Sequence, residues 1–279
     1  MPDVEPESAR RQPDFVAAIP ARTEAPREVL RFDRVGLSYD GRPVLQDLSF
    51  SVKAGETVAL LGPSGCGKTT LLNIVAGFLK PSAGVALCNQ REIAGPGPDR
   101  GVVFQSYALF DWMTVEDNIA FSLRCAGRPK AEQQDVARRM AALVGLAGFE
   151  KSYPYQLSGG MRQRCGLARV LAAGPSVMLM DEPFAAVDVQ TRETLQEEIL
   201  RIQATTGCTI LFVTHSIDEA VFLGSRIFLM LKGRLGAFDE FAVNLPLPRE
   251  QSDNRLHAEF LSVRERVYRA MRDTPGQEH

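Results

Sequence analysis

The stretch GPSGCGKT at residues 62–69 has the residue types and the spacing of a phosphate-binding loop. A short apolar run, TVALL (57–61), precedes it and predicts a buried strand, and a helix is predicted over 69–78. Glycine lets the backbone curl so that several N–H groups converge on phosphate oxygens. The residues expected to contact the nucleotide are Gly62, Pro63, Ser64, Gly65, Cys66, Gly67, Lys68, Thr69 and Thr70.

Two side chains of this loop carry the chemistry of a nucleoside triphosphate site. Lys68 would place a compact positive charge on the β- and γ-phosphates, and the Thr69 hydroxyl can bind Mg²⁺. The start of the following helix adds its dipole. An ordinary glycine-rich turn is the alternative, but both flanks match the motif, so we expect a nucleoside triphosphate and Mg²⁺ as ligands.

A second set of candidate residues ends another apolar strand, in VMLMDEP (177–183). Successive side chains of a strand diverge, so Asp181 and Glu182 can serve different tasks. We expect Asp181 to hold Mg²⁺ through water and Glu182 to orient and deprotonate the attacking water. A solvated acidic pair is the alternative. A second carboxylate at this position favours hydrolysis over transfer to a hydroxyl group.

The stretch LSGGMRQR (157–164) predicts another anion site in the same chain. Ser158, Gly159 and Gly160 precede a predicted helix, Met161–Arg169. Backbone N–H groups point outward at such a helix start, no Cβ blocks close approach, and the helix dipole favours negative charge. One chain with two phosphate sites therefore needs an explanation.

The bulk composition excludes several classes of protein. The chain has 279 residues and a net charge of −2, whereas an electrostatic nucleic-acid binder usually shows a basic excess. Five cysteines lie far apart without a C-x-x-C pair, which argues against a disulfide framework or zinc site and favours reduced cysteines. No run of apolar residues is long enough for a transmembrane helix, and no signal peptide is visible.

The order of predicted elements indicates an α/β fold. Short strands over 29–50, 101–105, 176–181 and 208–215 alternate with helices, which predicts a parallel sheet covered by helices. Residues from about 106 to 173 look mostly helical and interrupt the sheet. Residues 1–28 are expected to be disordered. At the end, an amphipathic helix is predicted to dock on the core rather than on a neighbouring subunit, through Leu256, Phe260, Val263, Val267 and Met271.

These motifs, in this order, resemble the ATP-binding subunits of ABC transporters over roughly residues 29–240. The stretch LSGGMRQR is the most specific of them, with Met161 where the family often has Gln. The resemblance implies a P-loop NTPase (RecA-like) parallel-sheet core with an antiparallel β subdomain and a helical subdomain insert. It places an ABC ATPase domain at 29–245, with the insert at about 106–173, and a tail at 246–279.

The resemblance also assigns roles to four further residues. Tyr39 looks like the aromatic residue that stacks on adenine, a core aromatic being the alternative. Gln105 resembles the glutamine that reaches Mg²⁺ and the attacking water. Asp188 resembles the aspartate of the loop that crosses between subunits. His215 resembles the γ-phosphate contact, although a histidine at a strand end is often only structural.

In the family, two ATPase domains associate head to tail, and this implies a use for the second anion site. Ser158–Gly160 of one copy would close on the γ-phosphate held by the Gly-rich loop of the other. We therefore expect an ATP-dependent dimer, with a homodimer favoured.

The stretch 102–121 resembles the nitrate, sulfonate and taurine group of importers, with Asp111 in place of a proline. The resemblance implies an ATPase that energises import of a small anionic solute such as nitrate, sulfonate, taurine or bicarbonate. Its partners would be an integral membrane permease and, indirectly, a periplasmic solute-binding protein. Trp112 would lie in the groove that receives the permease, with plain core packing of its side chain as the alternative. It would lie on the cytoplasmic face of the inner membrane and bind no nucleic acid. A non-transport ATPase acting on nucleic acid or ribosomes is the alternative, and a P-loop kinase would leave Ser158–Gly160 and His215 unexplained.

Overall fold

A six-stranded sheet forms the centre of the protein in the computed structural model, which describes residues 27–104, 108–185, 187–246, 249 and 254–272. The strands lie in the order β10-β9-β3-β8-β7-β6, and every neighbouring pair is parallel except β10 with β9. The predicted parallel sheet is thus confirmed. The strands are β3 (Thr57–Leu61), β6 (Arg100–Val103), β7 (Val177–Asp181), β8 (Thr209–Thr214), β9 (Arg226–Met230) and β10 (Phe238–Ala242).

Both faces of this sheet are covered, which explains why its strands read as continuous apolar runs. All of β3 is buried, and its successive side chains enter different cores. Val58 and Leu60 lie in one core with helix α1 (Lys68–Ala76) and a second sheet. Ala59 and Leu61 lie in the other core, which the remaining helices supply.

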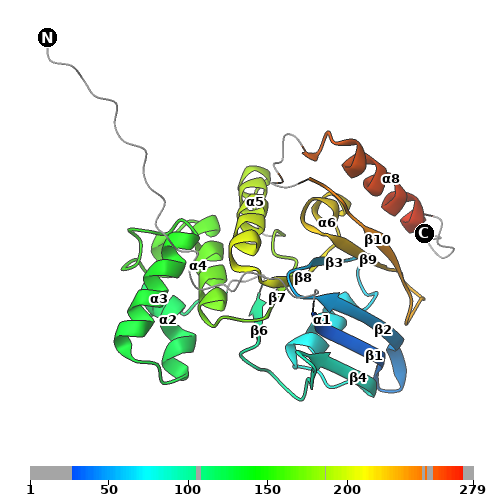
Figure 1. Cartoon of the computed structure of the whole chain (residues 1–279), viewed down its shortest axis with the longest axis horizontal. Helices are drawn as coiled ribbons and strands as arrows, with labels where there is room; N and C mark the ends of the chain where they lie inside the picture. The colour runs from blue at the N-terminus through cyan, green and yellow to red at the C-terminus, as the bar shows by residue number, and fades with distance from the viewer. Residues whose placement is uncertain (1–26, 105–107, 186, 247–248, 250–253, 273–279) are drawn as a thin grey trace, which may run out of the picture.

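The second sheet is antiparallel, with the strand order β2-β1-β4-β5 (Figure 1). This confirms the antiparallel subdomain that the family resemblance implied. Its first strand begins at Glu28, the last residue of the expected N-terminal extension, and residues 1–26 lie outside the described residues. The strands are β1 (Glu28–Tyr39), β2 (Arg42–Lys53), β4 (Ala83–Cys88) and β5 (Arg91–Glu92).

Three helices form a separate group between β6 and β7 along the chain, at the left of Figure 1. They pack on one another, and α4 also contacts β6. Asn118 holds the start of this group, because its buried amide donates to the carbonyls of Phe110, Met113 and Thr114. The helices are α2 (Val115–Cys125), α3 (Lys130–Leu143) and α4 (Gly159–Ala172), with a short 3₁₀ turn η1 (Pro154–Gln156) before α4.

Three further helices of the described ranges lie beside the central sheet (Figure 1) and are α5 (Val189–Thr206), α6 (Ile217–Leu223) and α8 (Ala258–Arg272). Helix α8 packs on α6 and β10 and buries Phe260, Val263 and Val267. The expectation that Leu256 continues this buried stripe is wrong: it precedes the helix and is 81% exposed. Within the described ranges, none of the helices combines the length and the apolar character that crossing a bilayer requires.

Candidate nucleotide-binding site

The Gly-rich loop joins the end of β3 to the start of α1, as predicted. Gly62 has φ 155°, and a Cβ there would lie 2.1 Å from the carbonyl oxygen of Met230 on β9, so a side chain cannot be accommodated. Gly67 caps α1 with φ 100°, a left-handed conformation that favours glycine. The loop is therefore pressed against the neighbouring strand, and α1 begins at Lys68.

Lys68 lies inside the curl of this loop. Its side chain is nearly buried, and its Nζ donates to the carbonyl oxygens of Gly62 and Pro63, each at 2.8 Å. A pocket of about 340 Å³ opens above it, and such a volume suits a small ligand. The pocket is lined by Val44, Ser64, Gly65, Gly67, Lys68, Thr69, Thr70 and Glu182. An ammonium group at the edge of a polar pocket on a Gly-rich loop fits a polyphosphate. Val44 is a lining residue that the motif did not indicate.

Asp181 meets the loop from the end of β7. Its Oδ1 lies 3.5 Å from Thr69 Oγ1. Burial raises the pKa of the Asp181 carboxyl above its ordinary value, while the Thr69 hydroxyl and the charge of Lys68 oppose that rise. A hydroxyl and a carboxylate are hard oxygen ligands of the kind that Mg²⁺ prefers, so the residues present fit this ion.

Glu182 and His215 face each other at the same edge of the sheet. Glu182 follows β7 with φ 44°, and its backbone N–H donates to Val213 on β8. His215 follows β8, and its Nδ1 lies 3.5 Å from Glu182 Oε1. The carboxylate is two-thirds buried and the imidazole is largely exposed. A carboxylate and an imidazole therefore stand together, and Glu182 also lines the phosphate pocket.

Ser158, Gly159 and Gly160 line a different pocket, of about 480 Å³. The Ser158 side chain caps α4 by accepting from the Met161 N–H, so the helix begins at Gly159, two residues earlier than predicted. Asp188 lines the same pocket and caps α5, accepting from the Thr191 N–H at 2.9 Å, and this bond holds the pKa of its carboxyl low. The two pockets share no lining residue.

The adenine contact and the glutamine contact that the family resemblance implied stay predictions. Tyr39 lies at the end of β1 and is 48% exposed, so its ring is not a core aromatic, but it does not line the phosphate pocket. Gln105 lies outside the described residues.

Two side chains that the motifs did not single out, the buried Gln163 and the largely buried Glu219, contact the backbone or side chains next to the site. The amide of Gln163 on α4 donates to the Pro183 carbonyl, the residue after Glu182, at 2.6 Å. Glu219 on α6 accepts from the Thr214 hydroxyl, next to His215. The S-x-x-E spacing of Ser216 and Glu219 marks a helix start in the sequence, but it does not predict that contact.

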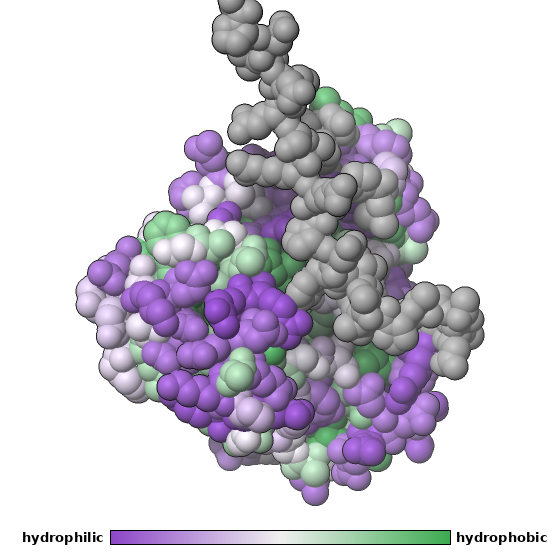
Figure 2. Space-filling view, turned by 60° about the vertical axis from the view of Figure 1, so that its left-hand side comes forward, coloured by the Kyte–Doolittle hydropathy of each residue, from purple (hydrophilic) through white to green (hydrophobic). Residues whose placement is uncertain are grey.

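Several exposed aromatic side chains lie in the helical group. The side of the molecule that carries this group comes forward in Figure 2. Trp112 is 73% exposed, which excludes the alternative of core packing. Its ring lies 5.4 Å from that of Phe110, which in turn lies 4.6 Å from Phe121. Tyr153 and Tyr155, which precede α4, stack on each other. Exposed aromatic side chains of this size are typical of protein interfaces.

Comparison with known proteins gives consistent matches. The sequence pattern described as "ABC transporter" matches residues 45–185. The chain is 49% identical over 206 residues to a taurine import ATP-binding protein of Yersinia pestis, covering 74% of this chain and 81% of that protein. It is 47% identical over 230 residues to an uncharacterized ABC transporter ATP-binding protein of Methanocaldococcus jannaschii, covering 82% and 84%.

A solved structure has a similar fold. It is a dimeric post-hydrolysis state of an ATP-binding cassette bound to ADP and phosphate. The TM-score is 0.67 at 28% sequence identity, and the match covers 78% of this chain and all of that chain.

Proposed function

The chain belongs to the ABC transporter family of ATP-binding proteins, and on that premise we propose that it drives import of a small anionic solute as an ATP-dependent dimer. It is an ATPase that binds ATP, as its family membership establishes. The solute, the partners and the role of each site residue are the proposal.

The observation that carries the proposal is the separation of two anion pockets on one chain. Lys68 and Glu182 line one, and Ser158 lines the other together with Asp188. A monomer has no use for the second pocket. In a head-to-tail dimer, Ser158–Gly160 of each copy would cap the γ-phosphate in the other copy's loop, which completes two sites at once.

The residues of the phosphate pocket divide the chemistry between them. Mg²⁺, held by Thr69, Asp181 and Gln105, would neutralise phosphate charge. Lys68 and the loop amides bind the phosphates, and Glu182 takes a proton from the attacking water. His215 contacts the γ-phosphate from the adjacent strand end. Tyr39 stacks on adenine from the edge of the smaller sheet.

The solute class follows from relatives named as taurine import proteins. We assign taurine or a related sulfonate as the first solute to test, ahead of nitrate and bicarbonate. The exposed ring of Trp112, with the half-buried rings of Phe110 and Phe121 beside it, would receive a membrane permease. The chain would then lie at the cytoplasmic face of the inner membrane. A periplasmic solute-binding protein would deliver the solute to that permease.

The dimer is tested with Glu182→Gln, which retains ATP binding but lacks the base. With Mg²⁺ and ATP this variant should elute at twice the monomer mass in size-exclusion chromatography with light scattering. The matched control Glu182→Gln/Lys68→Ala should remain monomeric. If the single variant stays monomeric with ATP at saturating concentration, the proposed scheme is wrong.

The transport role is tested on the complex. The chain should co-purify with a multi-spanning permease, and taurine with its binding protein should stimulate ATP hydrolysis in proteoliposomes. Co-purification with nucleic acid or ribosomes, without a permease, would favour the non-transport alternative instead.

A further inference from the structure

The turn that carries His215 is closed by the largely buried carboxylate of Glu219, which does not line the phosphate pocket. Glu219 accepts a hydrogen bond from the Thr214 hydroxyl at 2.5 Å, and that hydroxyl accepts from the Ser216 N–H at 3.0 Å. The Glu219 N–H in turn donates to the Ser216 hydroxyl. These bonds bracket His215 on both sides, while the imidazole itself stays largely exposed and makes its polar contact with Glu182.

The same carboxylate faces a second element through Arg192 on α5. The Nε of Arg192 lies 3.9 Å from Glu219 Oε1, and its Nη2 donates to the carbonyl of Val187 at 3.3 Å. Val187 directly precedes Asp188, and both line the Ser158 pocket. Arg192 therefore bridges the turn that bears His215 and the segment that bears Asp188.

We infer that Glu219 is a positioning residue, which holds the His215 turn in its working geometry and ties it through Arg192 to the Asp188 segment. This inference rests on the role proposed above for His215. Its consequence is that the rate of hydrolysis, rather than the affinity for ATP, depends on Glu219. An interaction that only stabilises the fold would instead change the melting temperature without a selective effect on turnover.

Burial at this place is costly for a carboxylate, and the surroundings show what compensates it. Glu219 has an 11% exposed side chain. Burial raises the pKa of its carboxyl, whereas the Thr214 hydroxyl and the charges of Arg192 and His215 lower it, and the charge of Glu182 raises it. A buried acid with three partners in one network is hard to replace by an uncharged side chain.

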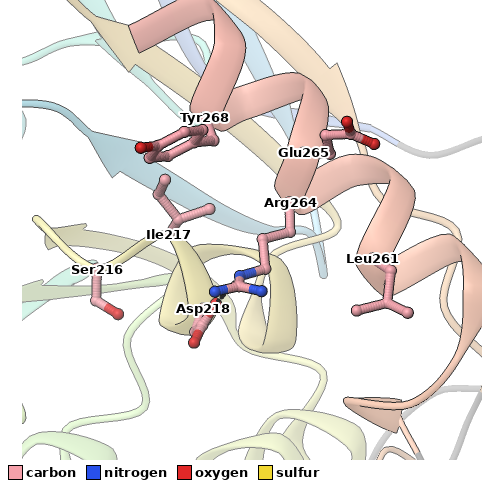
Figure 3. A pocket seen from close by; sticks show the side chains of 7 residues that line it. All are labelled: Ser216, Ile217, Asp218, Leu261, Arg264, Glu265 and Tyr268. Carbon is pink, nitrogen blue, oxygen red and sulfur yellow. Dashed lines mark ion pairs between the residues drawn. The ribbon is translucent and has the colours of Figure 1, made fainter. Parts of the chain in front are cut away.

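The neighbouring residue offers a matched control. Asp218 points to the outer side of α6, where Arg264 of α8 reaches it at 2.8 Å (Figure 3). This pair crosses an open pocket of about 600 Å³ between the two helices. Both side chains are substantially exposed, so the pair contributes little to stability. Asp218→Asn thus removes the same charge one residue away without touching the His215 turn.

The test compares Glu219→Gln with Asp218→Asn in the purified full-length chain. We expect Glu219→Gln to lower kcat for ATP hydrolysis by about 10- to 100-fold, with the Kd for a fluorescent ATP analogue changed by less than about threefold. Asp218→Asn should keep kcat within about twofold of the wild type. Combining Arg192→Met with Glu219→Gln should be no slower than the slower single variant, since the two residues act as one unit.

A second pair of variants decides the matter should Glu219→Gln fold poorly. Thr214→Val removes the hydroxyl and Thr214→Ser keeps it, so only the first should lose turnover. Wild-type kcat in Glu219→Gln, equal activity of the two Thr214 variants, or additive losses with Arg192→Met would each overturn the inference. The variant His215→Ala distinguishes failure of the proposed role of His215 from failure of the inference about Glu219. If His215→Ala keeps full activity, the proposed role of His215 is wrong. If His215→Ala is inactive while Glu219→Gln is active, only the inference about Glu219 is wrong.

Discussion

The hydroxyl of Thr69 lies 3.5 Å from the carboxylate of Asp181, although 112 residues separate them in the chain. The contact exists because α1 starts where β3 ends, and β8 alone lies between β3 and β7 in the sheet. Burial works against the charge of this carboxylate and raises its pKa. The protein thus keeps an acid where the acid destabilises the nucleotide-free chain, as binding sites commonly do.

The sign of that effect predicts the behaviour of Asp181→Asn. The pKa of the Asp181 carboxyl is higher in the folded chain than in the unfolded chain. The protonated carboxyl therefore stabilises the fold below the unfolded-state pKa, and this stability is lost as the pH rises through the folded-state pKa. Without nucleotide, the variant should therefore unfold at a higher temperature than the wild type at pH 7. Its free energy of unfolding should be larger by less than about 1 kcal/mol, because the Asp181 carboxyl is only partly buried.

The same substitution should lose Mg²⁺-dependent ATP binding. The stability prediction is checked by thermal unfolding of the wild type and Asp181→Asn at pH 7 and at about pH 3. The difference in unfolding temperature between the two chains should vanish at the lower pH, because Asp181 is then protonated in both the folded and the unfolded state. A variant that is less stable than the wild type at neutral pH would contradict it.

A buried ion pair between α4 and α5 predicts a stability effect. The Nε of Arg164 lies 2.8 Å from Glu198 Oε2, and the Glu198 side chain is 8% exposed. Among the described residues, Arg164→Met leaves this carboxylate with the more distant Arg201 as its ion-pair partner, at 3.7 Å. We expect a loss of about 2–4 kcal/mol in the free energy of unfolding, measured in urea.

The double variant Arg164→Met/Glu198→Gln tests the cause. It should recover most of the loss, because no buried charge is then left unpaired. If the double variant is as unstable as the sum of its single variants, the ion pair does not explain the loss.

The exposed indole of Trp112 predicts an effect on assembly but none on folding. Trp112→Ala should change the free energy of unfolding by less than about 0.5 kcal/mol, because the ring is 73% exposed. Co-purification with the permease should fall sharply. Leu256→Ala is the matched control, since Leu256 is also exposed but lies away from the helical group. Equal retention of the permease by the two variants would contradict this use of the aromatic surface.

Head-to-tail pairing predicts complementation between two inactive variants. Lys68→Ala damages the phosphate loop and Ser158→Arg damages the other pocket, so each should be inactive alone. In a mixed dimer one composite site carries both changes and the other carries neither. Mixing the two chains should therefore restore ATP hydrolysis above either background, in a colorimetric phosphate assay. Absence of any recovery, with mixed dimers present, would argue against composite sites.

The sequence by itself determined the local parts of this protein. The curl of residues 62–67, the buried strands around it and the glycine-lined start of α4 all follow from short patterns, because backbone conformation depends on near neighbours. Only the tertiary structure decided which parts meet. The approach of Thr69 to Asp181, the placing of Asp188 beside Ser158 and the link from Arg192 to Glu219 depend on sheet order and helix packing. Leu256 shows the converse: a helical spacing pattern put it on the buried stripe, but its contacts are set by elements distant in the chain, whose positions no short pattern encodes.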